Sequence, residues 1–234
     1  WYTISCKYQN CNNLTSVVSM IEEPFAFGES AFSVSSPCVL TIPFGMKDAY
    51  IEAGWEASTF RAGIRNTIEE TDQTPVIKFA DDAVKTLCVT YWDVNGDGEL
   101  SEAEAASLVD MGSIFQRNSN ITSFEELKFF KGLTSIKAYE FQRCGNLTSI
   151  TIPEGIESIG NNAFYLCYSL TTVTLPEGLT DIGYNAFSDC RGLTSIMIPK
   201  SVSSIGSGAF YRCSALTSII IPKDVTFINT SAFC

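Results

Sequence analysis

The sequence contains no histidine. This absence excludes Ser-His-Asp and Cys-His nucleophile pairs, a histidine general base and histidine metal ligands. Catalysis by carboxylates alone is not excluded by the lack of histidine. However, no pair of carboxylates recurs at a spacing that suits glycoside hydrolysis. No candidate catalytic residue is left, and we therefore expect a protein that is not an enzyme.

Basic residues and long apolar runs are also scarce. The chain has 15 Lys and Arg against 26 Asp and Glu, which gives a formal net charge of −11 over 234 residues. Nucleic acids and anionic membranes attract basic surfaces, so neither is expected as a partner. No apolar run is long enough to cross a bilayer, which predicts a protein that is not transmembrane. The chain begins at Trp1 without a Met or a signal peptide, as a mature or excised segment would.

The acidic residues are crowded into one stretch of the chain. Residues 69–110 hold eleven Asp and Glu but only two basic residues, Lys78 and Lys85. The flanks are close to neutral and rich in Leu, Ile, Thr and Ser. A change of composition of this kind marks a separate module between two others.

A strict 23-residue period follows from Cys144 onward. The unit reads C-x-x-L-T-S-I-x-I-P-x-x-[IV]-x-x-I-G-x-x-A-F. One such unit cannot bury its apolar side alone, so stacked copies with parallel strands and a shared Leu/Ile/Phe core are predicted. The period is carried by four cysteines (Cys144, Cys167, Cys190, Cys213), four leucines (Leu147, Leu170, Leu193, Leu216) and four prolines (Pro153, Pro176, Pro199, Pro222).

Two features of the unit predict its local geometry. Leu147, Ile150 and Ile152 alternate as one face of a short strand, which Pro153 ends because it lacks a backbone donor. A glycine stands where the chain is expected to turn tightly, which suits a residue that tolerates positive φ. These glycines are Gly160, Gly183 and Gly206, and Asn229 takes their place in the last copy.

These residues resemble the BspA-like type of leucine-rich repeat, found on bacterial cell surfaces, for which L-T-S-I-x-I-P followed by I-G-x-x-A-F is characteristic. The resemblance covers residues 131–234. It implies a leucine-rich-repeat solenoid of parallel β-strands and an extracellular or bacterial cell-surface location. Some BspA-like proteins bind extracellular-matrix proteins, so it also implies adhesin-like binding of a protein or polysaccharide on a host or neighbouring cell.

The N-terminal stretch resembles the end of a second domain of this type. Residues 11–17 are a degenerate copy of the unit, residues 39–43 read as a strand, and Trp55, Phe60, Ile64 and Ile68 stand at helical spacing, as in a cap helix. The other end stops at Cys234 in mid-repeat with an exposed Phe-rich edge. We expect that edge to be continued by a longer array or covered by another chain, for example through edge-to-edge self-association.

Residues 93–104 fit the EF-hand calcium loop. Asp93, Asn95 and Asp97 stand at loop positions 1, 3 and 5, and Gly98 at position 6, where the backbone turns sharply. The remaining expected ligands are the carbonyl of Glu99, the side chain of Ser101 and both carboxylate oxygens of Glu104, while Leu100 is expected to pack into the core. One Ca²⁺ is predicted, at a structural affinity of about 10⁻⁴ to 10⁻³ M. The alternative is an acidic linker without metal.

Helices are expected on both sides of this loop. Phe79, Ala83, Leu87 and Tyr91 share one face before it, and Ser101 begins a helix after it. The segment resembles a single dockerin-type loop, whereas dockerins carry two. Where a second loop should lie, residues 123–127 indicate a short helix with Ser123 as its cap and Glu126 in the capping-box position.

Three parts are therefore predicted. Residues 1–68 are the C-terminal end of a leucine-rich-repeat domain with a cap helix, residues 69–130 an acidic EF-hand-like helical module, and residues 131–234 BspA-like repeats truncated in mid-repeat. The repeating cysteines are expected to point inward as small buried hydrophobes. Among Cys6, Cys11 and Cys38, one disulfide remains an alternative to free thiols.

The outward strand positions form a neutral, hydroxyl-lined face. It is either a solvated surface with strand-forming residues or a shallow binding site, with Tyr165, Tyr168, Tyr184 and Tyr211 as aromatic anchors near the turns. The candidate binding residues are Thr148, Thr151, Thr172, Thr174, Thr194, Ser195, Thr217 and Ser218.

Three functions remain open. The first is a surface protein that binds protein or glycan, with a calcium-stiffened junction between two solenoids. The second is a structural spacer within a longer surface protein. The third, which rests on the dockerin likeness alone, is an accessory module of a polysaccharide-degrading system.

Overall fold

The structure, a computed structural model, describes residues 16–18, 39–43, 47–53, 67–71 and 74–233. The chain divides into two compact units, Trp1–Thr74 and Pro75–Cys234, each of which is described by itself. The second unit joins the predicted acidic module and the predicted repeats in one body.

The N-terminal unit contains a small parallel sheet. Strands β1 (Ser16–Val18), β2 (Val39–Pro43) and β3 (Thr67–Thr71) lie in the order β1-β2-β3. Helix α1 (Lys47–Glu52) follows β2 and buries Tyr50. Ile68 lies in β3 rather than in the expected cap helix, because its backbone pairs with Leu40 of β2. Trp55, Phe60 and Ile64 lie outside the described residues, as do Cys6, Cys11 and Cys38.

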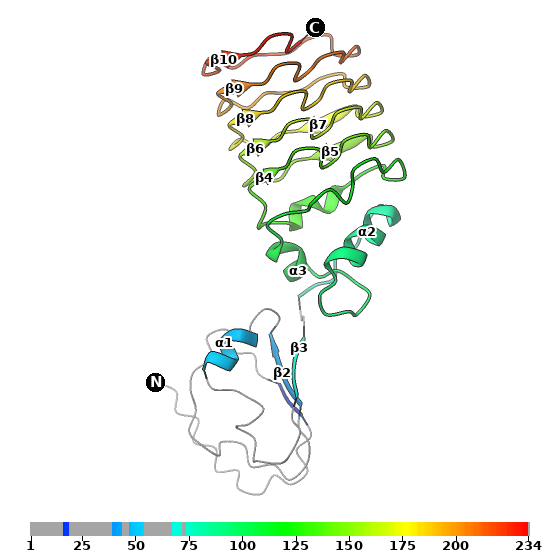
Figure 1. Cartoon of the computed structure of the whole chain (residues 1–234), viewed down its shortest axis with the longest axis vertical. Coiled ribbons are helices and arrows are strands. Elements are labelled where there is room, and N and C mark those ends of the chain that lie inside the picture. The colour runs from blue at the N-terminus through cyan, green and yellow to red at the C-terminus, as the bar shows by residue number, and fades with distance from the viewer. Residues whose placement is uncertain (1–15, 19–38, 44–46, 54–66, 72–73, 234) are drawn as a thin grey trace, which may run out of the picture. The chain divides into compact units, whose positions relative to one another are not determined.

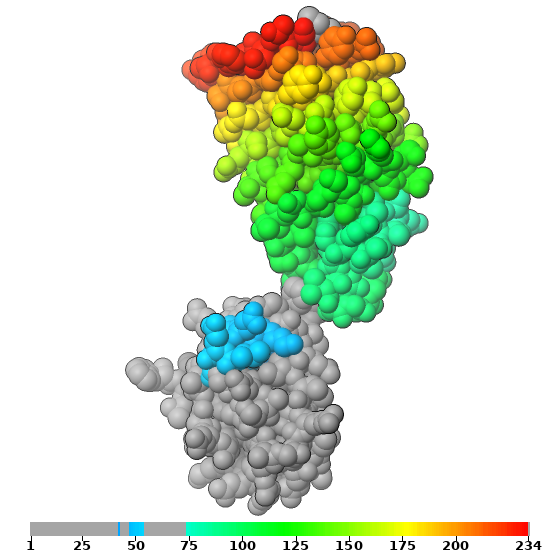
Figure 2. Space-filling view, viewed as in Figure 1, coloured from blue at the N-terminus to red at the C-terminus, as the bar shows by residue number. Residues whose placement is uncertain are grey.

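The second unit is a stack of coils preceded by short helices (Figure 1). On its surface, the residues follow one another in successive colour bands that end in red at the last coil (Figure 2). Its helices are α2 (Asp82–Trp92), α3 (Glu102–Ser107) and the 3₁₀ helix η2 (Glu125–Phe129). Strands β4 (Ser135–Ile136), β6 (Ser158–Ile159), β8 (Asp181–Ile182), β9 (Ser204–Ile205) and β10 (Phe227–Ile228) form one parallel sheet. Strands β5 (Ser149–Thr151) and β7 (Thr172–Thr174) form a second parallel pair.

Each coil repeats the backbone of the coil before it. Ser135 pairs with Ser158, Ser158 with Asp181 and Asp181 with Ser204. Hydrogen bonds also join the coils, and several of them link residues 23 apart, such as the Thr171 hydroxyl and the Thr148 carbonyl. Parallel stacking of this kind gives each coil neighbours only above and below it.

Stacked phenylalanines fill the interior of the coils. The rings of Phe141, Phe164 and Phe187 are nearly parallel, with centroids 5.2 and 5.1 Å apart along the stack. Phe115 extends the stack at one end, and Trp92 of α2 lies edge-on to Phe115 at 5.9 Å. The helices and the coils therefore share one hydrophobic core.

The repeating cysteines are buried free thiols, which confirms the prediction. Each thiol donates to a phenylalanine carbonyl of the preceding coil, as Cys167 does to Phe141 and Cys190 to Phe164. Burial raises the pKa of Cys144 to about 12. These side chains are packing elements because their thiolate forms are disfavoured.

The repeating glycines are needed for a different reason from the one predicted. Positive φ falls instead two residues later, at Asn162, Asn185 and Gly208. A Cβ at Gly160 would lie 2.6 Å from the Ala138 nitrogen, and a Cβ at Gly183 would lie 2.8 Å from the Asn161 nitrogen. Glycine is therefore required by the close approach of successive coils.

Two carboxylates close the N-terminal end of the stack. The Asp81 Oδ1 accepts hydrogen bonds from Ala83 and Val84 at the start of α2, and its Oδ2 accepts from Thr122. In the next coil the corresponding donor, Thr148 N–H, bonds to the carbonyl of Thr122. Asp81 thus takes the place of a carbonyl from a preceding coil.

In the larger sheet, the side chain of Glu140 likewise takes the place of a carbonyl from a preceding coil. Its Oε2 accepts the N–H of Lys137 at 3.0 Å, next to the edge strand β4. The equivalent N–H of Gly160 bonds to Ile136, and that of Gly183 bonds to Ile159. Glu140 is fully buried, and burial raises the pKa of its carboxyl to about 8. Asp81 therefore joins the segment around α2 to the coils as an N-terminal cap, while Glu140 closes the sheet edge from within the coils.

Two details of this cap differ from prediction. Helix α2 buries Val84, Cys88 and Trp92, whereas Tyr91, on the predicted face, is 61% exposed. The buried stripe differs because Trp92 packs against the phenylalanine stack.

The helix expected over residues 123–127 is the 3₁₀ helix η2. It begins after Phe124, and no side chain caps it. Glu126 instead uses its Oε1 to accept the N–H of Ala80 at 2.7 Å, which ties η2 to the segment before α2.

Candidate functional site

The predicted calcium loop lies between α2 and α3 and is folded by its own side chains. Both carboxylate oxygens of Asp93 accept backbone N–H groups, from Gly96 at 2.7 Å and from Gly98 at 2.8 Å. Asn95 accepts the N–H of Asp97 at 2.9 Å. Gly98 has a φ of 86°, so the sharp turn predicted at this position is confirmed.

Glu104 closes the loop from its far end. Its Oε1 accepts the N–H of Val94 at 2.9 Å and its Oε2 that of Ser101 at 2.9 Å. Ser101 in turn accepts the N–H of Glu104, so the two residues form a capping box at the start of α3. Glu104 is 2% exposed and Leu100 is fully buried, as predicted for Leu100.

The carboxylates of this loop do not converge on one point. Within the described residues, no group of three or more Asp, Glu or Cys side chains is placed to hold a metal ion. Glu99 pairs with Lys85 at 2.7 Å. Each carboxylate oxygen has two lone pairs, so the single N–H bond to each Asp93 oxygen leaves ligating capacity, whereas each Glu104 oxygen already accepts two hydrogen bonds. The residue types and their order therefore fit Ca²⁺, while their arrangement here is that of a self-closed turn.

The loop pairs with a short extended segment rather than with a second loop. Ile77 donates its N–H to Leu100 at 2.8 Å, and Glu102 donates to Pro75 at 2.9 Å. The loop is therefore attached to the first residues of the second unit, immediately after the boundary at Thr74.

The predicted binding residues lie on one exposed surface, here called the threonine face. All eight candidates are exposed. They are Thr148, Thr151, Thr172, Thr174, Thr194, Ser195, Thr217 and Ser218.

The threonine face has a structural part and an open part. The Thr148 hydroxyl donates to the Thr122 carbonyl at 3.0 Å and the Thr194 hydroxyl to the Thr171 carbonyl at 3.5 Å, so these hydroxyls bridge coils. Towards the last coils, Met197 and Ile220 are paired and each 80% exposed. The hydroxyl character of the face therefore gives way to an apolar patch.

The four predicted aromatic anchors do not act together. Tyr165, Tyr184 and Tyr211 line one groove of about 320 Å³ at the turns, and no residue of the threonine face lines it. Tyr168 lies elsewhere, with the Arg191 guanidinium 5.2 Å from its ring centroid. Neither Asp189 nor Arg212, which also line this groove, was singled out from the sequence, since both fall at variable positions of the repeat.

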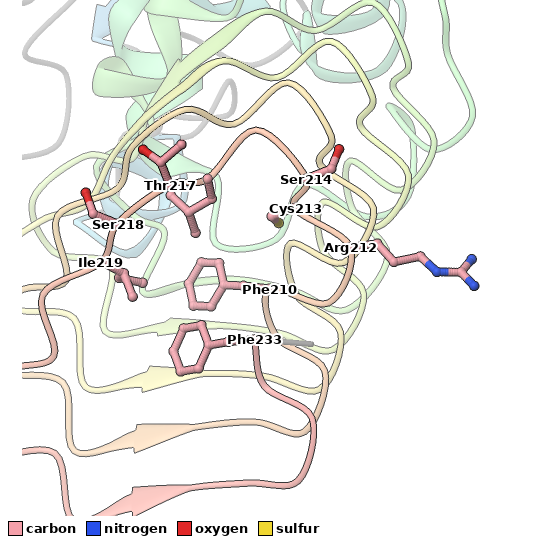
Figure 3. A pocket seen from close by; sticks show the side chains of 9 residues that line it. Phe210, Arg212, Cys213, Ser214, Thr217, Ser218, Ile219 and Phe233 are labelled. Atoms are coloured by element: carbon pink, nitrogen blue, oxygen red, sulfur yellow. The ribbon is translucent and has the colours of Figure 1, made fainter.

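The last described coil carries the Phe-rich edge that was predicted. A hollow of about 570 Å³ is lined by Phe210, Leu216, Ile219 and Phe233 among others. Figure 3 shows Phe210 and Phe233 side by side, while Arg212 points away from the hollow. Phe227 is 60% exposed and Phe233 is 39% exposed.

Among the helices that the structure describes, none has the length and apolar character needed to cross a membrane.

Comparison with known proteins agrees with this architecture. Residues 113–234 match the BspA type leucine rich repeat region in six copies. The match begins inside the segment predicted as the acidic helical module, so the repeats extend further towards the N-terminus than the regular period indicates. No curated protein matches the chain.

Three solved structures are similar to parts of the chain. A leucine-rich repeat protein from T. pallidum is 32% identical over 43% of this chain and 47% of that one, with a TM-score of 0.43. One from Bacteroides ovatus is 31% identical over 49% of this chain and 26% of that one, with a TM-score of 0.38. A leucine rich cell surface protein from Faecalibacterium prausnitzii is 22% identical over 91% of this chain and 43% of that one, with a TM-score of 0.38.

The chain spans less than half the length of each of these proteins. The family match rests on the coils themselves and covers more than half of the chain. The chain belongs to the BspA-type leucine-rich repeat family.

Proposed function

We propose that this chain is a non-catalytic, cell-surface binding protein that recognises a protein or glycan through the threonine face. The observation that carries the proposal is the exposure of all eight candidate residues on rigid coils. A surface fixed by backbone bonds between coils loses little conformational entropy on binding. The exposed pair Met197 and Ile220 adds an apolar area of the kind that partners cover.

Two lysines placed on the threonine face test this proposal. The double variant Thr172→Lys with Ser195→Lys should no longer attach to surfaces that are coated with extracellular-matrix protein or with whole bacterial cells. The matched control is Ser203→Lys with Thr226→Lys, which adds the same charge at exposed positions beside β9 and β10. Equal attachment of both double variants and the unmodified chain would contradict the role of the threonine face.

We also propose that the loop at residues 93–104 binds one Ca²⁺. The ligands would be the side chains of Asp93, Asn95, Asp97 and Ser101, the carbonyl of Glu99 and the carboxylate of Glu104. Support comes from the order of these residues, the turn at Gly98 and the crowding of five carboxylates in one short loop. Lys85 forms an ion pair with one of them, Glu99. A divalent cation would offset their mutual repulsion.

Calorimetric titration of Ca²⁺ into chelator-stripped protein tests this site. The chain should bind one ion and gain thermal stability, and Glu104→Gln should lose both effects. Glu102→Gln removes the same charge two residues away, outside the proposed ligand set, and should retain both. The absence of heat and stabilisation in the unmodified chain would identify the loop as a self-closed turn.

A structural spacer is the second candidate function. It is favoured by the position of the loop, whose backbone is tied to Pro75 and Ile77 directly after the boundary between the two units. A calcium ion there would stiffen the junction. Measurement of the interunit distance distribution, with and without Ca²⁺, would contradict this function if the distribution did not narrow.

A further inference from the structure

We propose that the groove lined by Tyr165, Tyr184 and Tyr211, here called the tyrosine groove, binds a neutral oligosaccharide. This inference rests on the binding function proposed above but uses a different surface. Successive coils contribute the three tyrosines together with Asn185, Asp189 and Arg212. The groove therefore spans more than one step of about 4.8 Å between coils, which favours an elongated ligand.

The backbone beneath the groove is held rigidly. Asn162 donates its N–H to the Tyr184 carbonyl at 2.8 Å, and Asp189 donates to the Tyr211 carbonyl at 2.7 Å. Asn161 accepts the N–H of Tyr184 through its side chain at 2.8 Å. The side chains that line the groove are therefore presented from fixed positions, which lowers the entropic cost of binding.

One glycine makes room for the Asn185 side chain in the lining of the groove. Gly208 has a φ of 65°, and the equivalent positions of the preceding coils hold Asn162 and Asn185 with similar φ. A Cβ at Gly208 would collide with the Asn185 Oδ1. The Asn185 side chain therefore packs against Gly208, in the space that a Cβ would take, and lines the groove from there.

The chemistry of the lining is that of a saccharide site. Tyr184 is 51% exposed and offers an apolar ring face with a polar hydroxyl. No aliphatic side chain lines the groove, so the apolar surface that it offers is that of aromatic ring faces. Amide, hydroxyl and carboxylate groups beside aromatic rings suit a ligand with both C–H faces and many hydroxyls.

Both charged side chains that line the groove are engaged by neighbouring side chains. The Asp189 carboxylate is 4% exposed, and its Oδ1 accepts from both Nε and Nη2 of Arg191, at 2.9 and 2.7 Å. The Arg212 guanidinium lies 5.0 Å from the centroid of the Tyr211 ring. Asp189 is paired, and the Arg212 guanidinium keeps its charge while it rests on an aromatic ring. The formal net charge of −11 on the chain disfavours an acidic ligand, so we expect a neutral one.

Saturation-transfer NMR and calorimetry with cellotetraose, chitotetraose and mannotetraose test the proposal. The chain should bind at least one of the three at millimolar concentration. Tyr184→Ala should weaken that binding by about tenfold. Tyr168→Ala, which removes a similarly exposed tyrosine outside the groove, should leave it unchanged.

Four outcomes would overturn the proposal. They are no binding of any of the three probes, equal binding by Tyr184→Ala, an equal loss in Tyr168→Ala, and binding of tetragalacturonate in preference to all three neutral probes. The double variant Thr172→Lys with Ser195→Lys separates this proposal from the previous one. Loss of saccharide binding in that variant would place the ligand on the threonine face. That result would contradict the proposal for the tyrosine groove and leave the proposal for the threonine face standing.

Discussion

The carboxylate of Asp81 accepts two hydrogen bonds from Thr122, one from its backbone N–H at 2.7 Å and one from its hydroxyl at 2.8 Å. The other oxygen of the same carboxylate caps helix α2 through Ala83 and Val84. A single side chain therefore starts the helix and terminates the first coil. Exposed strand edges invite pairing with other chains, and Asp81 occupies the donors at one such edge.

Asp81→Ala should destabilise the second unit by about 3 kcal/mol, since it removes a helix cap and the charge-assisted hydrogen bonds that Thr122 donates to a buried carboxylate. Urea unfolding followed by circular dichroism measures the change. Asp82→Ala removes the neighbouring exposed acid and should cost far less. A loss of equal size in both variants would show that Asp81 does not close the coils.

Acid should weaken the same contact. Burial raises the pKa of Asp81, but the hydrogen bonds from Thr122, Ala83 and Val84 outweigh burial, so the pKa lies below its usual value of 3.8. The stabilising contribution is therefore present above pH 3.8 and is lost as pH falls through the lowered pKa. Comparison of acid unfolding in the unmodified chain and Asp81→Asn should show a steeper loss in the unmodified chain, and parallel curves would contradict this account.

Glu140 should make stability fall as pH rises. Its pKa is about 8 in the folded chain because of burial, against an ordinary value of 4.5, so between these values the unfolded state is ionised while the folded state keeps its proton. The contribution of Glu140 to the free energy of unfolding is fully present below pH 4.5 and is lost at roughly 1.4 kcal/mol per pH unit up to pH 8. Glu140→Gln keeps an acceptor for Lys137 and has no proton to lose.

Denaturant unfolding between pH 5 and pH 8 measures this effect, with these values chosen to lie inside the window set by the two pKa values. The difference in unfolding free energy between Glu140→Gln and the unmodified chain should grow in favour of the variant as pH rises. Glu157→Gln, at an exposed position, should show no such trend. A difference that stays constant across this range would mean that Glu140 is ionised when folded.

The coils were predictable from the sequence because their pattern is local. Alternating Leu and Ile residues with a closing proline define each strand, and identical units must stack to bury them. The stacked rings of Phe164 and Phe187 and the buried thiols follow from the same period. The turn at Gly98 was predictable because one loop pattern contains it.

The cap was not predictable in the same way, because its contacts join distant residues. Asp81 and Thr122 are 41 positions apart, and nothing in either local sequence relates them. Two stripes of α2 have helical spacing, and only the packing of Trp92 decides between them. Glu140 did leave a signal, since it stands where the regular units have Ala163 and Ala186. A charged residue at an alanine position of the repeat marks the coil whose strand β4 is the edge of the larger sheet.

Substitution of a phenylalanine by alanine should reduce the free energy of unfolding most in the middle of the stack. Phe187→Ala removes a ring that contacts Phe164 and Phe210 and should cost about 3–5 kcal/mol of unfolding free energy. Phe233→Ala removes a ring that is 39% exposed and should cost less than half as much. Guanidinium unfolding of both variants provides the measurement, and equal losses would contradict a continuous interior stack.

Because successive coils approach closely, alanine substitution should have very different effects on stability at two glycines. A Cβ at Gly183 would lie 2.8 Å from both the backbone nitrogen and the side-chain oxygen of Asn161, whereas nothing lies within 4 Å of a Cβ at Gly178. Gly183→Ala should therefore push two coils apart and cost about 2–3 kcal/mol, while Gly178→Ala should be neutral or slightly stabilising because it only restricts the unfolded chain. Thermal unfolding of the two variants tests this directly. If Gly183→Ala kept the melting temperature of the unmodified chain, the spacing between coils could not be what requires glycine there.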